Sequence, residues 1–194
     1  MTGFMRTVFL LMVSLQLSLI AENIFGQSSN TIRERKIKSS AIIQTDYKNN
    51  DTLTAKNSYN EYDRDGNLIL EIEYFSDSTF KKKEAHQYDS HGNETGNMVY
   101  DRKGKLTEHT VTRYDNFNDK TEESVYDGDE KLVEKTVMKY NSFGQKESEI
   151  TTGADGKQKK RIAYTYDSKG MLMTRSSYNA GDKLVSERKY FYKY

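Results

Sequence analysis

Residues 88–106 read YDSHGNETGNMVYDRKGKL, a stretch that contains the pattern Tyr-Asp-x-x-Gly twice, at 88–92 and at 100–104. An Asp side chain can accept hydrogen bonds from its own backbone, and a Gly three positions later tolerates a positive φ. This combination is typical of the turn in a short β-hairpin. Each copy therefore predicts the end of one strand and a reversal of the chain.

The pattern recurs along the chain at a constant interval of 26 residues. One column of tyrosines keeps this interval without a gap: Tyr62, Tyr88, Tyr114, Tyr140 and Tyr166. A second column lies between the members of the first, with one departure from tyrosine: Tyr74, Tyr100, Tyr126, Thr152 and Tyr178. The glycine position of the turn is held by Gly66, Gly92, Gly104, Gly144, Gly156 and Gly170, and once by Asn118. Such self-similarity indicates a structural repeat, here a double unit of which 63–88 is one copy.

The segments between the turns have the composition of strands, as in Lys131–Tyr140, which reads KLVEKTVMKY. Alternation places on one face Leu132, Glu134, Thr136, Met138 and Tyr140, and on the other Val133, Lys135, Val137 and Lys139. Neither face is cleanly apolar. We therefore expect packing by Tyr and Leu ladders in register from unit to unit, without a thick aliphatic core.

The same turn can be followed upstream to Tyr47, which predicts about eleven turns and twelve strands. The expected fold is all-β, an antiparallel meander of hairpins over residues 47–194. The pattern leaves open whether the meander stays an open twisted sheet, coils as a solenoid or closes into a barrel. Residues 27–46 lack the repeat and are expected to form a polar lead or a capping strand. No sustained helical periodicity is present after residue 26.

Three motifs resemble the YD repeats of the RHS class: YDSHGN at 88–93, YDRKGKL at 100–106 and YDSKGML at 166–172. The resemblance covers about residues 47–194. It implies a β-sheet shell of the kind found in large secreted or surface proteins, some of which have a C-terminal toxin and others of which bind carbohydrate. We expect the resemblance to extend to the scaffold alone, without a toxin module.

Residues 1–26 are typical of an export signal. Arg6 precedes the apolar run Val8–Ile20, which is shorter than the ~20 residues of a membrane-spanning helix. We expect cleavage after Gly26, so that the mature chain begins at Gln27 and is secreted or periplasmic. A retained N-terminal anchor is the alternative.

Composition excludes several classes of protein. The chain has 30 Lys+Arg against 29 Asp+Glu, and loss of residues 1–26 removes one of each, Arg6 and Glu22. This balance lacks the basic excess expected for nucleic acid or an anionic membrane surface. The absence of Cys excludes disulfides, a lipidated N-terminal cysteine and thiolate metal sites. Fifteen tyrosines and no proline argue against disorder.

No set of residues predicts catalysis, a cofactor or a metal. His86, His91 and His109 share no metal-ligand spacing and are expected to be solvated strand and turn residues. Residues 63–67 resemble the opening of a calcium loop but lack its closing Glu. No nucleophile elbow or phosphate loop is present. We therefore expect a protein that is not an enzyme.

Two functions stay open. The first is a binding module for a glycan or a protein, and the second is a structural protein that pairs through its sheet edges with itself or a larger secreted partner. The candidate binding residues lie in the last expected strand, 183–194, where alternation puts Tyr190, Tyr192 and Tyr194 on one face. We expect this strand either to seal a closed sheet or to dock a partner by strand addition.

Overall fold

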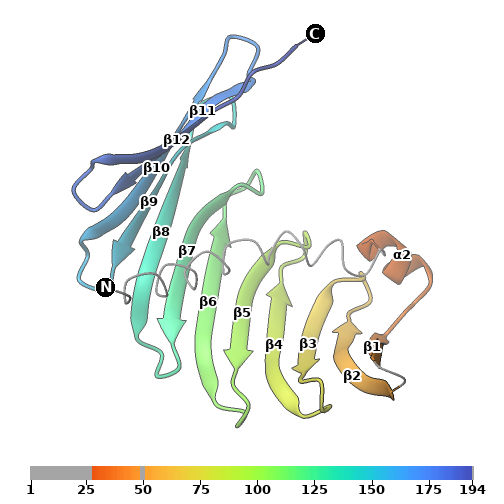
Figure 1. The fold of residues 1–194 in the computed structure, drawn as a ribbon. Helices are drawn as coiled ribbons and strands as arrows, with labels where there is room; N and C mark the ends of the chain where they lie inside the picture. Colours follow the sequence, from red (N-terminus) through yellow and green to blue (C-terminus); the bar gives the residue numbers. More distant parts are fainter. Residues whose placement is uncertain (1–27, 49–50, 194) are drawn as a thin grey trace.

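The computed structural model describes residues 28–48 and 51–193, which form a single twelve-stranded antiparallel sheet preceded by a short helix, α2 (Ser29–Glu34) (Figure 1). The strands are β1 (Ser39–Lys48), β2 (Asp51–Tyr62), β3 (Leu68–Tyr74), β4 (Phe80–Tyr88), β5 (Glu94–Tyr100), β6 (Leu106–Tyr114), β7 (Lys120–Asp127), β8 (Leu132–Tyr140), β9 (Lys146–Gly153), β10 (Gln158–Tyr166), β11 (Leu172–Asn179) and β12 (Leu184–Lys189). The all-β meander of twelve strands is confirmed. The export signal predicted for residues 1–26 lies outside the described residues.

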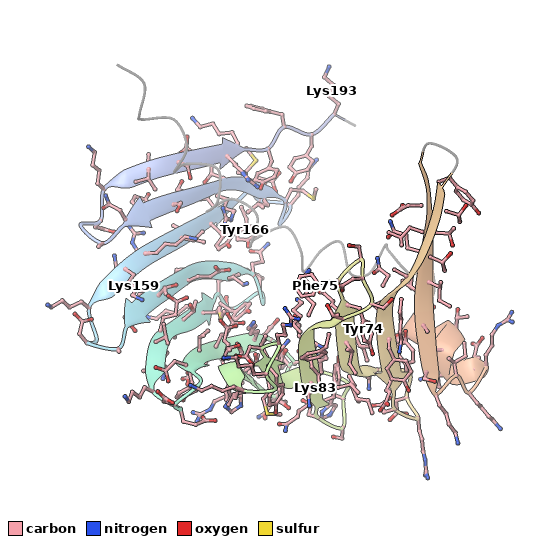
Figure 2. All side chains as sticks on the ribbon, turned by 60° about the horizontal axis from the view of Figure 1, so that its bottom comes forward. Tyr74, Phe75, Lys83, Lys159, Tyr166 and Lys193 are labelled. Atoms are coloured by element: carbon pink, nitrogen blue, oxygen red, sulfur yellow. The ribbon has the colours of Figure 1, made fainter. Side chains whose placement is uncertain are left out.

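The sheet is open. Each strand pairs only with its neighbours in the sequence, and within the described residues no pairing joins β1 to β12. Of the three arrangements that the sequence leaves open, the structure adopts the open sheet. Figure 2 shows that this sheet curls around a hollow, with β1 and β12 on opposite sides of it.

The ten turns from β2–β3 to β11–β12 share one geometry. In the first, Gly66 donates its backbone N–H to the carbonyl of Asp63 at 3.3 Å, and Asp63 donates to the carbonyl of Asn67 at 3.0 Å. The Asp63 carboxylate accepts from the backbone N–H groups of Asp65 and Asn67, both at 2.9 Å. This is a type I turn closed by a bulge whose last residue must take a positive φ.

The positive φ explains the glycines of the repeat. The residue four positions after each column residue has a positive φ in all ten turns, and six of these residues are the glycines named above. The other four are Ser78, Asn118, Glu130 and Asp182, with φ between 57° and 65°. Non-glycine residues are strained there by about 1 kcal/mol or more, so the turn geometry is maintained even where the sequence disfavours it.

The first tyrosine column joins successive hairpins. The hydroxyl of each clamp tyrosine, the name used here for Tyr88, Tyr114, Tyr140, Tyr166 and Tyr192, donates to the backbone carbonyl 20 residues earlier at 2.8–3.0 Å. These carbonyls belong to the first residues of β3, β5, β7, β9 and β11. Each clamp therefore ties the strand that enters one Tyr-Asp turn to the first residue of the adjacent strand, which leaves the Tyr-Asp turn before it.

The second column is covered by basic side chains or histidine. Lys83 lies over the ring of Tyr100 at 4.3 Å, and Arg161 lies over that of Tyr178 at 3.8 Å. Each cation stands directly opposite its tyrosine in the strand register. His109 has the same position beside Tyr126. Where Thr152 replaces the tyrosine, Lys135 opposite it forms an ion pair with Glu122.

The two faces of the sheet differ in burial. On β8, Val133 and Val137 are exposed, whereas Met138 is buried. On β10, Ile162 is buried and Lys159 is exposed. The more buried face is called the inner face here, and by strand alternation it includes the clamp tyrosines. Figure 2 shows that Lys159, on the other face, points away from the concave side of the sheet. This assignment agrees with the alternation predicted for residues 132–140.

The aliphatic core is small, as the composition predicts. Within the described residues the buried hydrophobic side chains are Ile32, Met138 and Ile162, while six buried side chains are polar. The last strand is shorter than predicted: β12 ends at Lys189, and residues 190–193 are not in a strand. They stay beside β11 because Tyr190 donates its N–H to Met173 and Tyr192 clamps the carbonyl of Leu172.

The clamp can be tested by removing one hydroxyl. Tyr114→Phe loses the hydrogen bond to Glu94 while retaining the ring, and we expect it to lower the free energy of unfolding by about 1 kcal/mol. Tyr126→Phe is the matched control, because the Tyr126 hydroxyl forms no hydrogen bond within the described residues. Urea denaturation measures both variants, and equal destabilisation would contradict the clamp.

Candidate functional site

The inner face is most polar over β2 to β5. Asn60, Glu71, Glu84, His86 and Asn97 lie together there and are called the His86 cluster. Asn60 pairs with Glu71, which pairs in turn with Glu84 on the next strand. His86 pairs with Asn97. The cluster thus takes its side chains from four consecutive strands.

The curvature of the sheet buries this part of the inner face. The residues two positions before the first four tyrosines of the first column lie on this face, and they form a column of their own: Asn60, His86, Thr112 and Met138. Asn60 is 1% exposed, and the other three are about a tenth exposed or less. The side chains of this column are polar at Asn60, His86 and Thr112 and apolar at Met138. The same buried position of the repeat therefore offers hydrogen-bonding groups in the first half of the inner face but not at β8.

His86 has one satisfied ring nitrogen. Its Nδ1 lies 2.8 Å from the carboxylate of Glu94, a distance that assigns a proton to Nδ1. The side-chain amide of Asn97 is 3.4 Å from the same nitrogen and 3.5 Å from Glu84. The imidazole is therefore fixed in orientation, with Nε2 left as its free hydrogen-bonding group.

Three buried polar atoms of the cluster have no hydrogen-bond partner. They are Asn60 Oδ1, His86 Nε2 and Asn97 Oδ1, and in the described part of the chain they are the only buried side-chain atoms of this kind. Each such atom costs about 1–3 kcal/mol when it is left unpaired. His86 and Asn97 are paired on β4 and β5, and Asn60 lies on the same face of β2, so this part of the inner face gains stability when a hydrogen-bonding molecule reaches these atoms.

The pKa values of two ionisable side chains of the cluster, Glu71 and His86, are raised. Burial, with the neighbouring carboxylates of Glu84 and Glu73, raises the pKa of Glu71. Burial opposes the charged form of His86, but the hydrogen bond and charge of Glu94 outweigh it, and the pKa of His86 is raised. Lys82 bridges Glu73 at 3.0 Å and Glu84 at 2.5 Å. The cluster is thus acidic overall, with its cations already paired.

The prediction that all three histidines are solvated is wrong for His86, whose side chain is 10% exposed. The physical reason is the curl of the sheet, which the strand pattern does not reveal. His109 lies on the outer face beside Tyr126 and Glu130, and His91 is exposed in a turn. The structure does not bring the three together.

The tyrosines predicted as a binding site lie at the other end of the sheet. Tyr192 continues the first tyrosine column one interval beyond Tyr166 and is a clamp, and the residue is 40% exposed. Tyr190 shares the column of His86, and Tyr194 lies outside the described residues. Neither the His86 cluster nor the role of Tyr192 as a clamp was predicted from the sequence. The repeat interval was the available signal, because it aligns Asn60 with His86 and Tyr166 with Tyr192.

Two further features bear on chemistry. Residues 28–48 and 51–193 contain no group of three or more His, Asp or Glu side chains placed to hold a metal ion. In the same residues no helix has both the length and the apolar character needed to cross a membrane.

Neither a family model nor a curated protein matches the chain. Among solved structures, a porin-like protein from Bacteroides uniformis is 12% identical with a TM-score of 0.40, over 73% of this chain and 56% of its own length. A Bacteroides fragilis protein with unknown function is 16% identical, with a TM-score of 0.28, over 81% of this chain and 96% of its own. The TcdB2-TccC3-TEV structure is 11% identical, with a TM-score of 0.28, over 78% of this chain and 11% of its own.

The raised pKa of His86 makes stability depend on pH. Folding raises this pKa, so His86 stabilises the folded state below the ordinary imidazole pKa of about 6.5, and the contribution is lost as the pH rises through the folded-state pKa. We therefore expect His86→Gln to be more destabilising at about pH 5.5 than at about pH 9.

The control is His91→Gln, which changes an exposed turn residue. Urea melts at the two pH values measure both variants. A His86→Gln penalty that is the same at both pH values would show that the imidazolium form does not contribute to stability.

Proposed function

We propose that the chain is an exported, non-enzymatic binding module of the YD-repeat type that binds a glycan on its inner face, over the His86 cluster. The observation that supports this proposal is the set of three unpartnered buried atoms, Asn60 Oδ1, His86 Nε2 and Asn97 Oδ1. Export to the periplasm or beyond is supported by the pattern of residues 1–26, and the repeat type by the motifs at 88–106 and 166–172.

A glycan fits the chemistry of the cluster. Sugar hydroxyls both donate and accept hydrogen bonds, so one hydroxyl can donate to an amide oxygen and another can pair with an imidazole nitrogen in either protonation state. The neighbouring Glu94 side chain is 42% exposed and offers a carboxylate acceptor at the surface of the cluster. Tyr88, which ends β4, adds an amphipathic ring suited to stacking on a sugar.

The second candidate function is assembly through a sheet edge, with a protein as partner. All six residues of β12 are exposed, and Leu184 and Val185 are 48% and 59% exposed. An edge strand with apolar side chains offers unpaired backbone groups to another strand. We favour the glycan because the edge shows no unsatisfied buried group comparable to those of the cluster.

The test uses an array of neutral oligosaccharides, followed by calorimetric titration of the best ligand. Asn97→Ala should weaken binding at least about tenfold, equivalent to ~1.4 kcal/mol, because it removes an amide that the ligand would satisfy. Glu123→Ala is the matched control, since residue 123 occupies the same place one repeat later.

Binding lost equally in both variants, or no glycan bound by the unmodified protein, would refute the proposal. If the array is blank and a sizing column shows self-association that Val185→Lys abolishes, the assembly function replaces it.

A further inference from the structure

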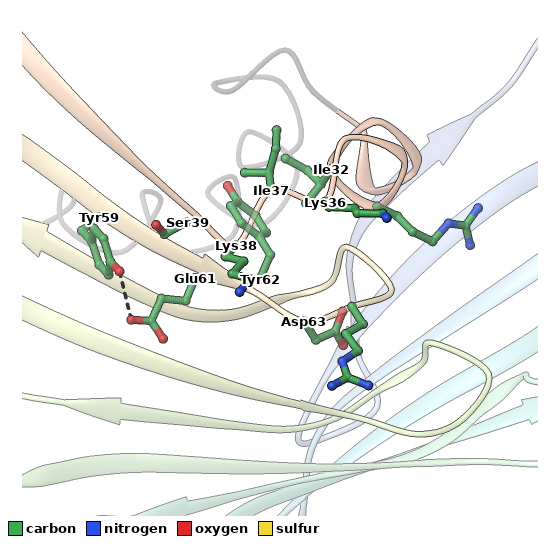
Figure 3. Close-up of a pocket in the computed structure, with 11 residues that line it drawn as sticks. Ile32, Lys36, Ile37, Lys38, Ser39, Tyr59, Glu61, Tyr62 and Asp63 are labelled. Carbon is green, nitrogen blue, oxygen red and sulfur yellow. Dashed lines mark hydrogen bonds between the residues drawn. The ribbon is translucent and has the colours of Figure 1, made fainter.

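A cavity of about 790 Å³ lies between α2 and the ends of β1 and β2 (Figure 3). Its lining contains no side chain of the His86 cluster, although the Tyr62 hydroxyl in its wall lies 3.5 Å from the Asn60 side-chain amide. The volume falls within the range of about 300–1,000 Å³ that is usual for small-molecule sites. The cavity is therefore large enough to enclose a ligand of modest size.

The helix that roofs the cavity is fixed in place. Ser28 caps its first turn, and Ile37 donates its backbone N–H to Ile32 at 3.0 Å, which closes the last turn. Gly66 approaches the helix so closely that a Cβ there would lie 2.2 Å from the carbonyl oxygen of Ser29. The segment after α2 is tied to β2, since Tyr62 donates its backbone N–H to the carbonyl of Lys38 at 2.9 Å. The sheet therefore contacts the chain on both sides of the helix, and the cavity exists without a ligand.

The wall of the cavity includes an apolar part. Ile32, Ile37 and Tyr62 contribute side chains to it, and Ile32 is 3% exposed. The Tyr62 hydroxyl is already engaged, 3.1 Å from the hydroxyl of Ser40. This part of the wall therefore offers contact to an alkyl chain or a ring, with no polar group left to satisfy.

The charged part of the wall is basic. Arg33, Lys36, Lys38 and Arg64 line the cavity, and none of them forms an ion pair with a carboxylate within the described residues. The two acidic residues of the lining are occupied elsewhere: Glu61 accepts a hydrogen bond from the Tyr59 hydroxyl at 3.1 Å, and Asp63 accepts from the backbone of its turn. Because these four cations have no carboxylate partner and lie beside an apolar wall, the cavity favours the binding of a ligand with an anionic group and an apolar part.

The position of Lys36 adds to this argument. It follows the last turn of α2 with a φ of 55°, at the left-handed position where glycine is usual. A lysine there is disfavoured by the backbone and contributes no ion pair among the described residues. Its ammonium group is therefore available to a ligand in the cavity.

We propose that this cavity binds an anionic amphiphile, with its alkyl chain against Ile32, Ile37 and Tyr62 and its acidic head among Arg33, Lys36, Lys38 and Arg64. The head can be the carboxylate of a fatty acid or the phosphate of a single-chain lipid, because both are anions that accept hydrogen bonds from lysine and arginine side chains. The proposal is independent of glycan binding on the inner face.

The test titrates the full chain with dodecanoate, with a dodecyl phosphate and with dodecyltrimethylammonium, each below its micellar concentration. We expect one or both anions to bind at least about tenfold tighter than the cation of equal chain length. The tighter anion identifies the head group. Equal binding of all three would overturn the proposal, because it would show apolar adsorption alone, and so would a lack of binding.

The decisive variant is Lys36→Gly, which removes one cation and gives the left-handed position its preferred residue. It should melt at the same temperature as the unmodified chain or higher, yet bind the anion at least about fivefold more weakly. Asn118→Gly is the control, because it relaxes a left-handed residue with φ 65° in a remote turn. Unchanged anion affinity in Lys36→Gly would overturn the assignment of the head group to these four basic side chains.

Discussion

The hydrogen bond from each clamp tyrosine to the carbonyl 20 residues earlier is the contact on which this sheet depends. A single-layer sheet has two faces in contact with solvent, and this one buries few aliphatic side chains. Its hairpins must therefore be held by contacts that repeat along the strand ends. Burial raises the pKa of Tyr88, Tyr114, Tyr140 and Tyr166, which keeps the hydroxyl a donor.

The turns and the clamps act at the same place. Each clamp tyrosine from Tyr88 to Tyr166 is followed directly by a turn whose positive-φ residue is four positions on, so one short motif both reverses the chain and ties it to the previous hairpin. Mixed cation and tyrosine pairs such as Arg161 and Tyr178 support the other face. Because these contacts are local, positions between them are free to differ from repeat to repeat. The His86 cluster and the cavity under α2 occur where such positions depart from the pattern.

The strand count, the turn positions and the two faces of β8 follow from the sequence, since period-2 alternation and turn chemistry are local properties. The burial of His86 does not, because it depends on the curl of the sheet. The sequence pattern also does not predict α2, a six-residue helix too short to show a 3.6-residue period. Tyr192 was predictable from its spacing to Tyr166, yet the break in the strand after Lys189 was not.

The central claim is that one full repeat, such as residues 115–140, ends at a clamp tyrosine and forms a complete structural unit. The most direct test compares thermal melts, followed by far-UV circular dichroism, of a chain lacking residues 115–140 and a chain lacking residues 115–127. The longer deletion joins Tyr114 to Asn141, removes β7 and β8 together and leaves the remaining strand directions and clamps intact. The shorter one removes β7 alone and brings the inner-face Tyr114 to the turn that the outer-face Tyr126 enters in the intact chain, so every later strand must turn its inner-face side chains to the outer face. The account predicts a cooperative β-sheet melt for the longer deletion and none for the shorter. Equal melting of the two chains, or loss of the transition in the longer deletion alone, would contradict it.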